Sequence, residues 1–228
     1  LRRSSTIPGY PARILLVKLS ALGDCLQTLP AAAALKQHFP ASRLTWVVKK
    51  EYAPLLQGQP SVDDLITFDR KKQPKADFFR LVRAIKARNF DLAIDFTGLA
   101  RSALLPWLAH IRCRIGFANG REGSPWFYTS RVPVPDPDLY ASLRYGLLLA
   151  PLGIDARHCE TRVALTEAAI ASCRRLLKVL PGQPQRYVGL HPFSRWKTKN
   201  IPATIWEPIT HLLAEAGFIP VLIGGAEN

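Results

Sequence analysis

Short runs of apolar and β-branched residues alternate along the chain with amphipathic stretches, and this alternation constrains the fold more than any other feature. The first run covers residues 13–19, and a helical stretch follows it to about His38, where Pro40 ends the pattern. The same order recurs, so that successive strands are separated by helix-sized connections. Strands connected in this way form a parallel sheet covered by helices on both faces. The sequence therefore predicts an α/β fold whose ligands bind beyond the carboxyl ends of the strands.

The predicted elements divide the chain into two parts. The first part ends in residues 116–138, whose four Pro and three Gly predict a long loop over the binding edge of the sheet. After a Pro-Gly-Gln-Pro linker a second strand–loop–helix–strand unit begins, and it is too short for a complete domain of this type. We predict a first domain over residues 1–164 and the incomplete start of a second over residues 165–228. Strands are expected at residues 13–19, 44–48, 62–68, 91–96, 187–191 and 219–225, and helices at residues 24–38, 52–57, 77–88, 99–111, 139–152, 165–180 and 204–216.

Composition excludes several classes of protein. The chain has 228 residues, 48% of them hydrophobic and 21% charged, which is enough apolar material for a packed core and excludes disordered and collagen-like chains. No apolar run approaches the roughly 18 residues of a membrane-spanning helix, and no secretory signal is evident, so we expect a soluble cytosolic protein. The cysteines lie far apart without a CxxC motif, which predicts buried or partly buried reduced thiols and no metal site: Cys25, Cys113, Cys159 and Cys173.

Positive charge is concentrated in the first part of the chain. The formal net charge is +14, and residues 1–150 hold 22 basic and 11 acidic residues, against nine and six in residues 151–228. Nucleic acid, an anionic membrane surface or a phosphorylated substrate would each fit this excess, as would a merely solvated basic surface. One predicted helix and the loop before it offer basic and aromatic side chains for such a surface: Lys71, Lys72, Lys75, Phe78, Phe79, Arg80 and Arg83.

The turn after the first strand, residues 18–24, is the first candidate site. Gly23 suits a tight turn, and Asp24 stands where the following helix begins, at the carboxyl edge of the predicted sheet. Asp24 is then either an ordinary helix N-cap or a general base directed at a substrate hydroxyl. The glycine spacing matches neither the dinucleotide-binding nor the P-loop pattern, so neither site is predicted.

Two further segments at strand ends carry polar groups. Asp95 and Gly98 are followed by Arg101 and Ser102, which either offer donors to an anion or belong to an ordinary capped helix. The loop over residues 191–202 places hydroxyls and cations before a helix whose first amides have no partner, an arrangement that binds a pyrophosphate without a glycine-rich turn. The side chains concerned are Ser194, Arg195, Lys197, Thr198 and Lys199.

Taken in order, these stretches resemble the ADP-heptose:lipopolysaccharide heptosyltransferase family. Its members are inverting glycosyltransferases with two Rossmann-like domains of the GT-B type that face a cleft. The family pattern continues past the last Gly-Gly pair with a segment that binds the nucleotide sugar, so the resemblance implies that the second domain is incomplete here. The matching features are residues 14–18, Gly23-Asp24, residues 28–31, Asp95-x-x-Gly98-x-x-Arg101-Ser102, residues 114–117, residues 189–192 with Ser194 and Lys199, and residues 224–227.

The resemblance implies a role for each matching residue. Asp24 corresponds to the catalytic carboxylate, while Ser194 and Lys199 correspond to groups at the phosphates of the donor, with Arg195 and Thr198 in the same loop. The acceptor side is assigned to Lys18, Ser20, Arg101 and Ser102. Neither a metal nor a cofactor is implied, because ADP-heptose is the donor substrate.

The resemblance also implies the partners and the place of action. The acceptor is the inner core of lipopolysaccharide, either Kdo-lipid A or an already heptosylated core. Its phosphates and acidic sugars would account for the positive charge of the first domain. A cytoplasmic enzyme at the inner face of the bacterial inner membrane, in weak contact with anionic lipid and not with nucleic acid, is expected.

Three alternatives stay open at this point. The chain would fit equally a glycosyltransferase of the same architecture that uses another nucleotide sugar. The net charge of +14 also suggests a nucleic-acid-binding protein, although the sequence contains no RNP, zinc-finger or KH signature. A non-catalytic binding module descended from such an enzyme is the third alternative.

Overall fold

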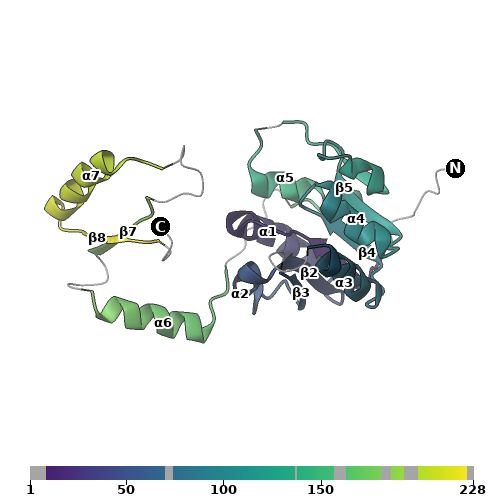
Figure 1. Cartoon of the computed structure of the whole chain (residues 1–228), viewed down its shortest axis with the longest axis horizontal. Coiled ribbons are helices and arrows are strands. Elements are labelled where there is room, and N and C mark those ends of the chain that lie inside the picture. Colours follow the sequence, from purple (N-terminus) through teal and green to yellow (C-terminus); the bar gives the residue numbers. More distant parts are fainter. Residues whose placement is uncertain are drawn as a thin grey trace. The chain divides into compact units, whose positions relative to one another are not determined.

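The computed structural model (Figure 1) describes residues 9–69, 74–136, 138–156, 163–180, 186–192 and 200–224. The chain divides by its internal contacts into two compact units, Leu1–Ala164 and Leu165–Asn228.

A six-stranded parallel sheet forms the centre of the larger unit. The strands follow the order β3-β2-β1-β4-β5-β6, so the chain starts in the middle of the sheet, builds one edge and then crosses over to build the other. This is the strand order of a doubly wound, Rossmann-like sheet, and it confirms the predicted α/β fold class. The strands are β1 (Arg13–Val17), β2 (Arg43–Lys49), β3 (Asp64–Phe68), β4 (Leu92–Asp95), β5 (Cys113–Phe117) and β6 (Ser130–Val132).

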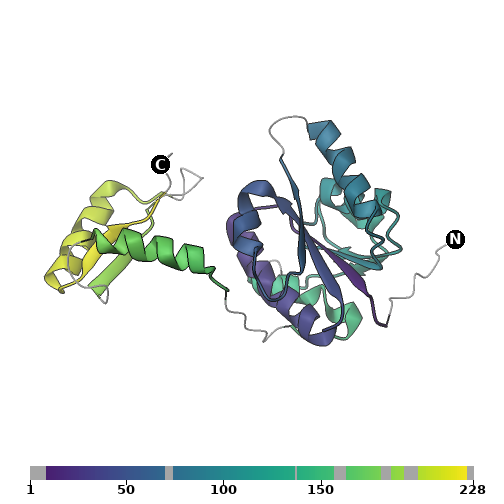
Figure 2. The ribbon, with the colours of Figure 1, turned by 90° about the horizontal axis from the view of Figure 1, so that it is seen from below.

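Helices cover both faces of this sheet (Figure 2). Ile14 and Leu16 of β1 pack into a core with α1 and α5, whereas Leu15 and Val17 pack into a second core with α3 and α4. Because both faces are buried, β1 is a continuous apolar run rather than an alternating one. The helices are α1 (Leu22–His38), α2 (Ala53–Leu56), α3 (Pro74–Lys86), α4 (Ala100–Leu108) and α5 (Ala141–Leu147), with short 3-10 helices at Lys50–Tyr52, Ser124–Phe127 and Ala150–Leu152.

The register of the two central strands determines what meets at the carboxyl edge. β1 and β4 are neighbours in the sheet, and Val17 pairs with Asp95. The turns that begin at Lys18 and Phe96 therefore lie side by side. Two of the segments that the sequence analysis selects are brought together in this way.

The segment after α4 differs from the prediction. The sequence predicts a loop over residues 116–138, but β5 begins before it and β6 lies inside it. Arg114 and Gly116 interrupt the apolar pattern of β5, and β6 has only three residues, so neither strand shows the expected signature. Pro106 is accommodated in the last turn of α4, which ends at Leu108 rather than near Ile111.

The smaller unit contains two parallel strands and two helices. β7 (Tyr187–Leu190) pairs with β8 (Ile219–Leu222), and the helices are α6 (Glu167–Lys178) and α7 (Ala203–Glu215). The hydroxyl of Thr166 caps α6 by accepting the amide of Ala169 at 3.2 Å. Leu190 is the one hydrophobic side chain that is buried among the described residues of this unit.

The structure also bears on the predictions about membrane-spanning helices, cysteines and metal ligands. None of the described helices combines the length and apolar character needed to cross a membrane. Cys25 and Cys113 are buried, whereas Cys173 is exposed on α6, contrary to expectation, and Cys159 lies outside the described residues. In the described part of the chain, His, Cys, Asp and Glu side chains do not gather in groups of three that could hold a metal ion.

Candidate active site

Asp24 lies in the first turn of α1, directly beyond the carboxyl end of β1. The N-cap of α1 is Ala21, so Asp24 occupies the third helical position rather than the cap itself. Its Oδ2 nevertheless accepts the amide of Ala21 at 3.2 Å, and the helix dipole favours a negative charge at this end. The side chain is 43% exposed. Asp24 is therefore an anchored carboxylate that a substrate can still reach.

Lys18 is a buried side chain that lies beside this carboxylate. Its side chain is 6% exposed, and Nζ donates to the Tyr145 hydroxyl at 2.8 Å and to the Phe96 carbonyl at 3.2 Å. Nζ also lies 3.5 Å from Oδ2 of Asp24. Burial lowers the pKa of Lys18, and the nearby Asp24 charge opposes this effect. Nζ of Lys18 is thus held by groups inside the protein, and the predicted role of Lys18 as an acceptor contact stays a prediction.

Tyr145 connects Lys18 with Asp24 from a different element. It lies on α5, which packs along α1, and its hydroxyl donates to Oδ1 of Asp24 at 3.1 Å. Burial, together with the Asp24 charge, raises the pKa of Tyr145, so the phenol stays protonated and remains a donor. Sequence reasoning missed Tyr145. The available signal was a tyrosine within an apolar helix, because a buried phenol needs a hydrogen-bond partner.

Cys25 adjoins this cluster but is chemically inert. Its thiol is buried, and burial raises its pKa to about 11. A thiol that keeps its proton at neutral pH is not a nucleophile. Cys25 therefore contributes to packing beside Asp24.

A second carboxylate, Asp95, is fully enclosed at the end of β4. Oδ1 accepts the amides of Thr97 at 2.8 Å and Gly98 at 3.3 Å. Oδ2 accepts the hydroxyls of Ser102 at 2.7 Å and Tyr128 at 2.8 Å. Burial raises the pKa of Asp95, and these hydrogen bonds oppose the rise. Because it has no path to solvent, Asp95 shapes the turn after β4 rather than reacting with a substrate.

The predicted residues around α4 separate into two kinds. Ser102 is 0% exposed and its hydroxyl donates to Asp95, and its predicted contact with the acceptor stays a prediction. Arg101, in contrast, is exposed on the first turn of the same helix. Ser20 is partly exposed in the turn before α1. The acceptor roles of Arg101 and Ser20 stay predictions.

The predicted donor site begins at the carboxyl end of β7. Its four residues, Ser194, Arg195, Thr198 and Lys199, lie outside the described residues. Of the flanking structure, Nδ1 of His191 forms a hydrogen bond with the Ile223 carbonyl at 2.9 Å. The donor-binding assignment therefore stays a prediction.

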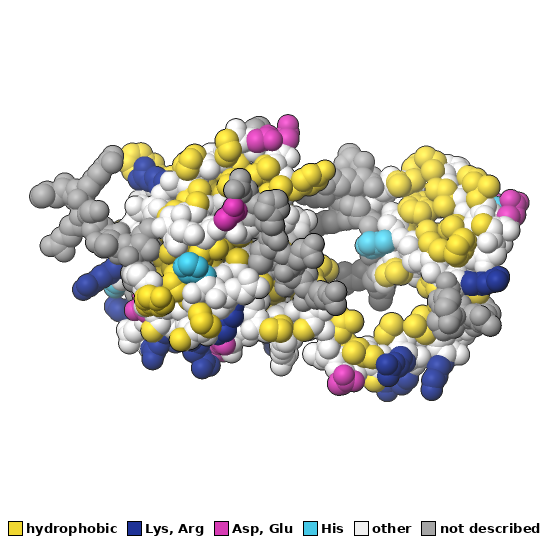
Figure 3. Space-filling view, turned by 180° about the vertical axis from the view of Figure 1, so that it is seen from behind, with side chains coloured by type: hydrophobic (Ala, Val, Ile, Leu, Met, Phe, Trp, Pro, Cys, Tyr) yellow, Lys and Arg dark blue, Asp and Glu magenta, His cyan; other side chains and the backbone are white. Residues whose placement is uncertain are grey.

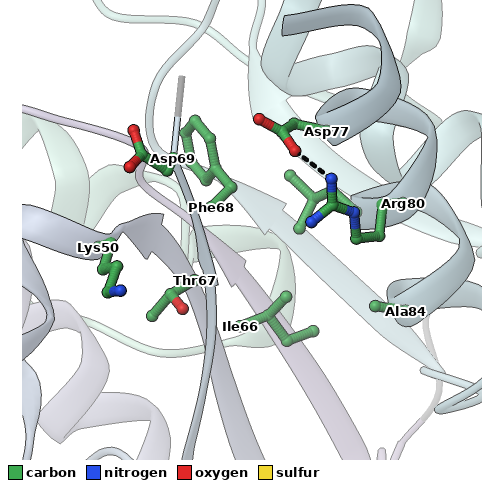
Figure 4. A pocket seen from close by; sticks show the side chains of 9 residues that line it. Lys50, Ile66, Thr67, Phe68, Asp69, Asp77, Arg80 and Ala84 are labelled. Atoms are coloured by element: carbon green, nitrogen blue, oxygen red, sulfur yellow. Dashed lines mark hydrogen bonds and ion pairs between the residues drawn. The ribbon is translucent and has the colours of Figure 1, made fainter. Parts of the chain in front are cut away.

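A cavity of about 530 Å³ opens beside the carboxyl end of β3 (Figure 4). Lys50 lines it from the segment after β2, Asp69 from the end of β3, and Asp77 and Arg80 from α3. Asp77 and Arg80 form an ion pair within the cavity wall. Two cations and two carboxylates thus line the cavity, which makes it polar but not strongly basic.

The basic and aromatic surface predicted along α3 is confirmed only in part. Phe79 is 64% exposed and Arg83 is exposed, as this prediction requires. Phe78 instead packs against the core beneath α3, which corrects its assignment to the surface. Lys71 and Lys72, and the side chain of Lys75, lie outside the described residues.

Comparisons with known proteins agree with this architecture. Lipopolysaccharide heptosyltransferase 1 of Salmonella typhimurium is 33% identical over 227 residues, which cover 95% of the chain and 69% of that protein. The crystal structure of a family 9 glycosyl transferase from Veillonella parvula matches with a TM-score of 0.83 at 21% identity, over 95% of the chain and 63% of that structure, which shows the fold. The structure of E. coli heptosyltransferase WaaC with ADP-2-deoxy-2-fluoro heptose matches with a TM-score of 0.70 at 28% identity, over 94% of the chain and 69% of its own.

The chain thus spans about two thirds of the length of the proteins that it matches. The sequence model of one family covers residues 78–228, which is more than half of the chain. That family is described as glycosyltransferase family 9 (heptosyltransferase). By this match and by its identity to the Salmonella relative, the chain belongs to glycosyltransferase family 9, the heptosyltransferases.

Proposed function

We propose that the protein transfers a heptose from ADP-L-glycero-D-manno-heptose to the inner core of lipopolysaccharide, with inversion and without a metal ion. The observation that carries the proposal is Asp24, a carboxylate that is anchored on both oxygens and still 43% exposed at the binding edge of the sheet. Relatives named lipopolysaccharide heptosyltransferases, and a WaaC structure with a fluorinated ADP-heptose, support the choice of donor and acceptor.

Asp24 is proposed to act as the general base. An acceptor hydroxyl attacks the anomeric carbon of the donor, its proton passes to the Asp24 carboxylate, and the bond from carbon to phosphate oxygen breaks with its electron pair going to ADP. The transition state has oxocarbenium character, and inversion requires the base and the leaving group on opposite faces of the sugar.

The leaving diphosphate gains negative charge as this bond breaks. Lys199, Ser194, Thr198 and Arg195 are proposed to stabilise it, together with the first amides of α7. Such contacts favour the transition state over the bound donor because the charge develops only during the reaction. The proposal makes Lys199→Ala a variant that chiefly weakens binding of ADP and of the donor.

The acceptor is proposed to bind to the larger unit, which carries most of the positive charge of the chain. Arg101 is exposed in the first turn of α4, Ser20 is partly exposed in the turn before α1, and the cavity with Lys50 and Arg80 opens at the same edge of the sheet. Phosphates and acidic sugars of the inner core would be attracted to these cations. A weak contact with anionic lipid at the cytoplasmic face of the membrane is part of the same proposal.

The experiment is a transfer assay with the full-length protein, ADP-heptose and lipopolysaccharide acceptors that end in Kdo or in a first heptose. Mass spectrometry should show the gain of one heptose on one of these acceptors, and NMR of the product should show inversion. Calorimetry with UDP- and GDP-sugars serves as the comparison. Tighter binding of one of these, or transfer from it, would replace ADP-heptose with another nucleotide sugar.

A further inference from the structure

We propose that Tyr145, supported by Lys18, is the positioning residue that holds the Asp24 carboxylate in the orientation needed to accept a proton. This inference rests on the proposed function, because it assigns a role to groups around the proposed base. It adds a residue on α5 that the motifs around Asp24 do not include.

Both oxygens of Asp24 are held, and by different parts of the fold. Oδ1 accepts from the Tyr145 hydroxyl at 3.1 Å, while Oδ2 accepts from the Ala21 amide at 3.2 Å and lies 3.5 Å from Nζ of Lys18. These groups come from α5, from the N-cap of α1 and from the end of β1. A carboxylate fixed at both oxygens keeps one rotamer, so its remaining lone pairs point in a constant direction.

The chemistry of the three groups fixes the direction of their hydrogen bonds. An ammonium group has no acceptor, so Nζ of Lys18 must donate to the Tyr145 oxygen at 2.8 Å. The phenol proton is then directed to Asp24, which is the acceptor within reach on its other side. Lys18 thereby orients Tyr145, and Tyr145 orients Asp24.

The surroundings hold this arrangement rigidly. The Tyr145 ring lies edge-on to Phe96 at a centroid distance of 6.0 Å and is 2% exposed. The Lys18 backbone carbonyl accepts the buried indole of Trp46 at 3.1 Å, and its Nζ is also held by the Phe96 carbonyl. Tyr145 and Lys18 are therefore fixed independently of Asp24, which is the requirement for a positioning role.

Among the residues that the structure describes, the charged and titratable groups near Asp24 come from few elements. Lys18 reaches it from the turn directly after β1, Cys25 adjoins it on α1, and Tyr145 contacts it from α5. Arg144 stacks over the Tyr145 ring at 5.7 Å, and Asp95 acts on Lys18 through its charge. Both Lys18, by its charge, and Tyr145, by its hydrogen bond, favour the charged carboxylate, and removing either group removes that stabilisation.

The test compares Tyr145→Phe with the wild type in the full-length protein, using the transfer assay. This variant keeps the ring and removes the hydroxyl, which donates to Asp24 and accepts from Lys18. We expect kcat to fall about tenfold, the KM for the nucleotide sugar to stay within about twofold, and the acid limb of the kcat–pH profile to move to higher pH. Lys18→Met should produce the same three changes, and it serves if Tyr145→Phe does not fold.

Two tyrosines of the same unit provide matched controls. Tyr128→Phe also removes a hydroxyl that donates to a carboxylate, but that carboxylate is Asp95, so stability should fall while the acid limb stays in place. Tyr140 is 79% exposed, and Tyr140→Phe should leave both stability and the pH profile unchanged.

The outcomes separate this inference from the proposed function. If Asp24→Asn abolishes transfer but Tyr145→Phe and Lys18→Met keep the wild-type kcat and acid limb, the positioning role is wrong and the base assignment stands. If Asp24→Asn transfers heptose at the wild-type rate, the base assignment fails, and the positioning role fails with it. A wild-type protein without any transferase activity would contradict both.

Discussion

The two units of this chain differ in how completely they enclose a core. In the larger unit, six strands are covered on both faces, and the polar groups of its site are bonded to one another inside the fold. In the smaller unit, two strands and two helices bury one hydrophobic side chain among their described residues, and hydrophobic side chains gather on the face of this unit that Figure 3 shows. Its exposed apolar residues include Leu176, Val179, Ile205, Leu212, Leu222 and Ile223.

This difference shows which part of the proposed site is held rigidly by the fold. The orientation of Asp24 follows from strand register and from a helix pair in the larger unit. The proposed donor loop instead lies between β7 and α7, on a unit whose described residues offer little packing to hold it. We infer that the larger unit is self-supporting, whereas the smaller one depends on additional contacts for its stability.

The largest expected effect comes from separating the units. Residues 1–164 produced alone should unfold in urea in one cooperative transition, with a stability of about 5–10 kcal/mol. Residues 165–228 produced alone should show no cooperative transition, because burial of apolar surface is the main source of stability. Amide exchange measured on both fragments checks this result. Protected amides throughout β7 and β8 in the short fragment would remove the contrast.

A second prediction concerns the buried carboxylate of the larger unit. Asp95→Ala leaves four donors without their acceptor, and we expect the free energy of unfolding to fall by about 3 kcal/mol. Asp91→Ala, at the other end of β4, is the matched control. It removes one exposed hydrogen bond to the Arg13 amide and should cost less than about 1 kcal/mol. Equal losses from the two variants in urea titrations would show that the Asp95 network is not a stabilising element.

Substituting one strand glycine in each unit compares how tightly the two units are packed. A Cβ on Gly116 of β5 would lie 2.3 Å from the Tyr128 ring, which is itself held by Asp95, so Gly116→Ala should cost about 2 kcal/mol. A Cβ on Gly189 of β7 would meet the end of the Ile223 side chain at 2.7 Å. Ile223 is 55% exposed and can turn away, so Gly189→Ala should cost less than about 0.5 kcal/mol. Thermal unfolding of both variants measures how much stability each one loses. A larger loss of stability from Gly189→Ala than from Gly116→Ala would show that the smaller unit is the more tightly packed.

The smallest expected effect is a pH dependence of the larger unit. Burial raises the pKa of Asp95 above the ordinary value of 3.8, so the folded state takes up a proton at higher pH than the unfolded chain does. A raised folded pKa contributes stability that is present at low pH and is lost as the pH rises through that pKa. Acidification from neutral pH towards 3.8 should therefore stabilise the wild type relative to Asp95→Asn, which does not titrate. A difference that grows with rising pH would contradict the direction of the shift.

The sequence predicted the parts of this fold that repeat a strong local pattern. The strand at residues 13–19, the helix after it and the placement of Asp24 at their junction follow from periodicity and turn chemistry. β5 and β6 were missed because their apolar residues are interrupted or too few to form a pattern. Short strands of this kind form because a neighbouring strand is already in place, which local sequence does not reveal.

The sequence predicted single residues of the candidate site, but it did not predict the hydrogen bonds that connect them. The resemblance assigned Lys18 and Ser102 to the acceptor side, and it did not indicate that both side chains are buried and hydrogen-bonded inside the protein. Tyr145 reaches Asp24 from 121 residues away in sequence, and no spacing rule connects the two positions. Contacts of this type depend on the packing of α5 against α1, which is a property of the tertiary structure.

The most direct test of the account is the rate of a single turnover with Asp24→Asn, measured after the full-length protein is loaded with ADP-heptose and mixed with acceptor. Asp138→Asn, an exposed carboxylate of the same unit, is the control. If Asp24 is the general base, we expect a rate at least about 100-fold below wild type for Asp24→Asn, with donor affinity unchanged in calorimetry and with Asp138→Asn at the wild-type rate. A wild-type rate for Asp24→Asn would return this carboxylate to a purely structural role at the start of α1.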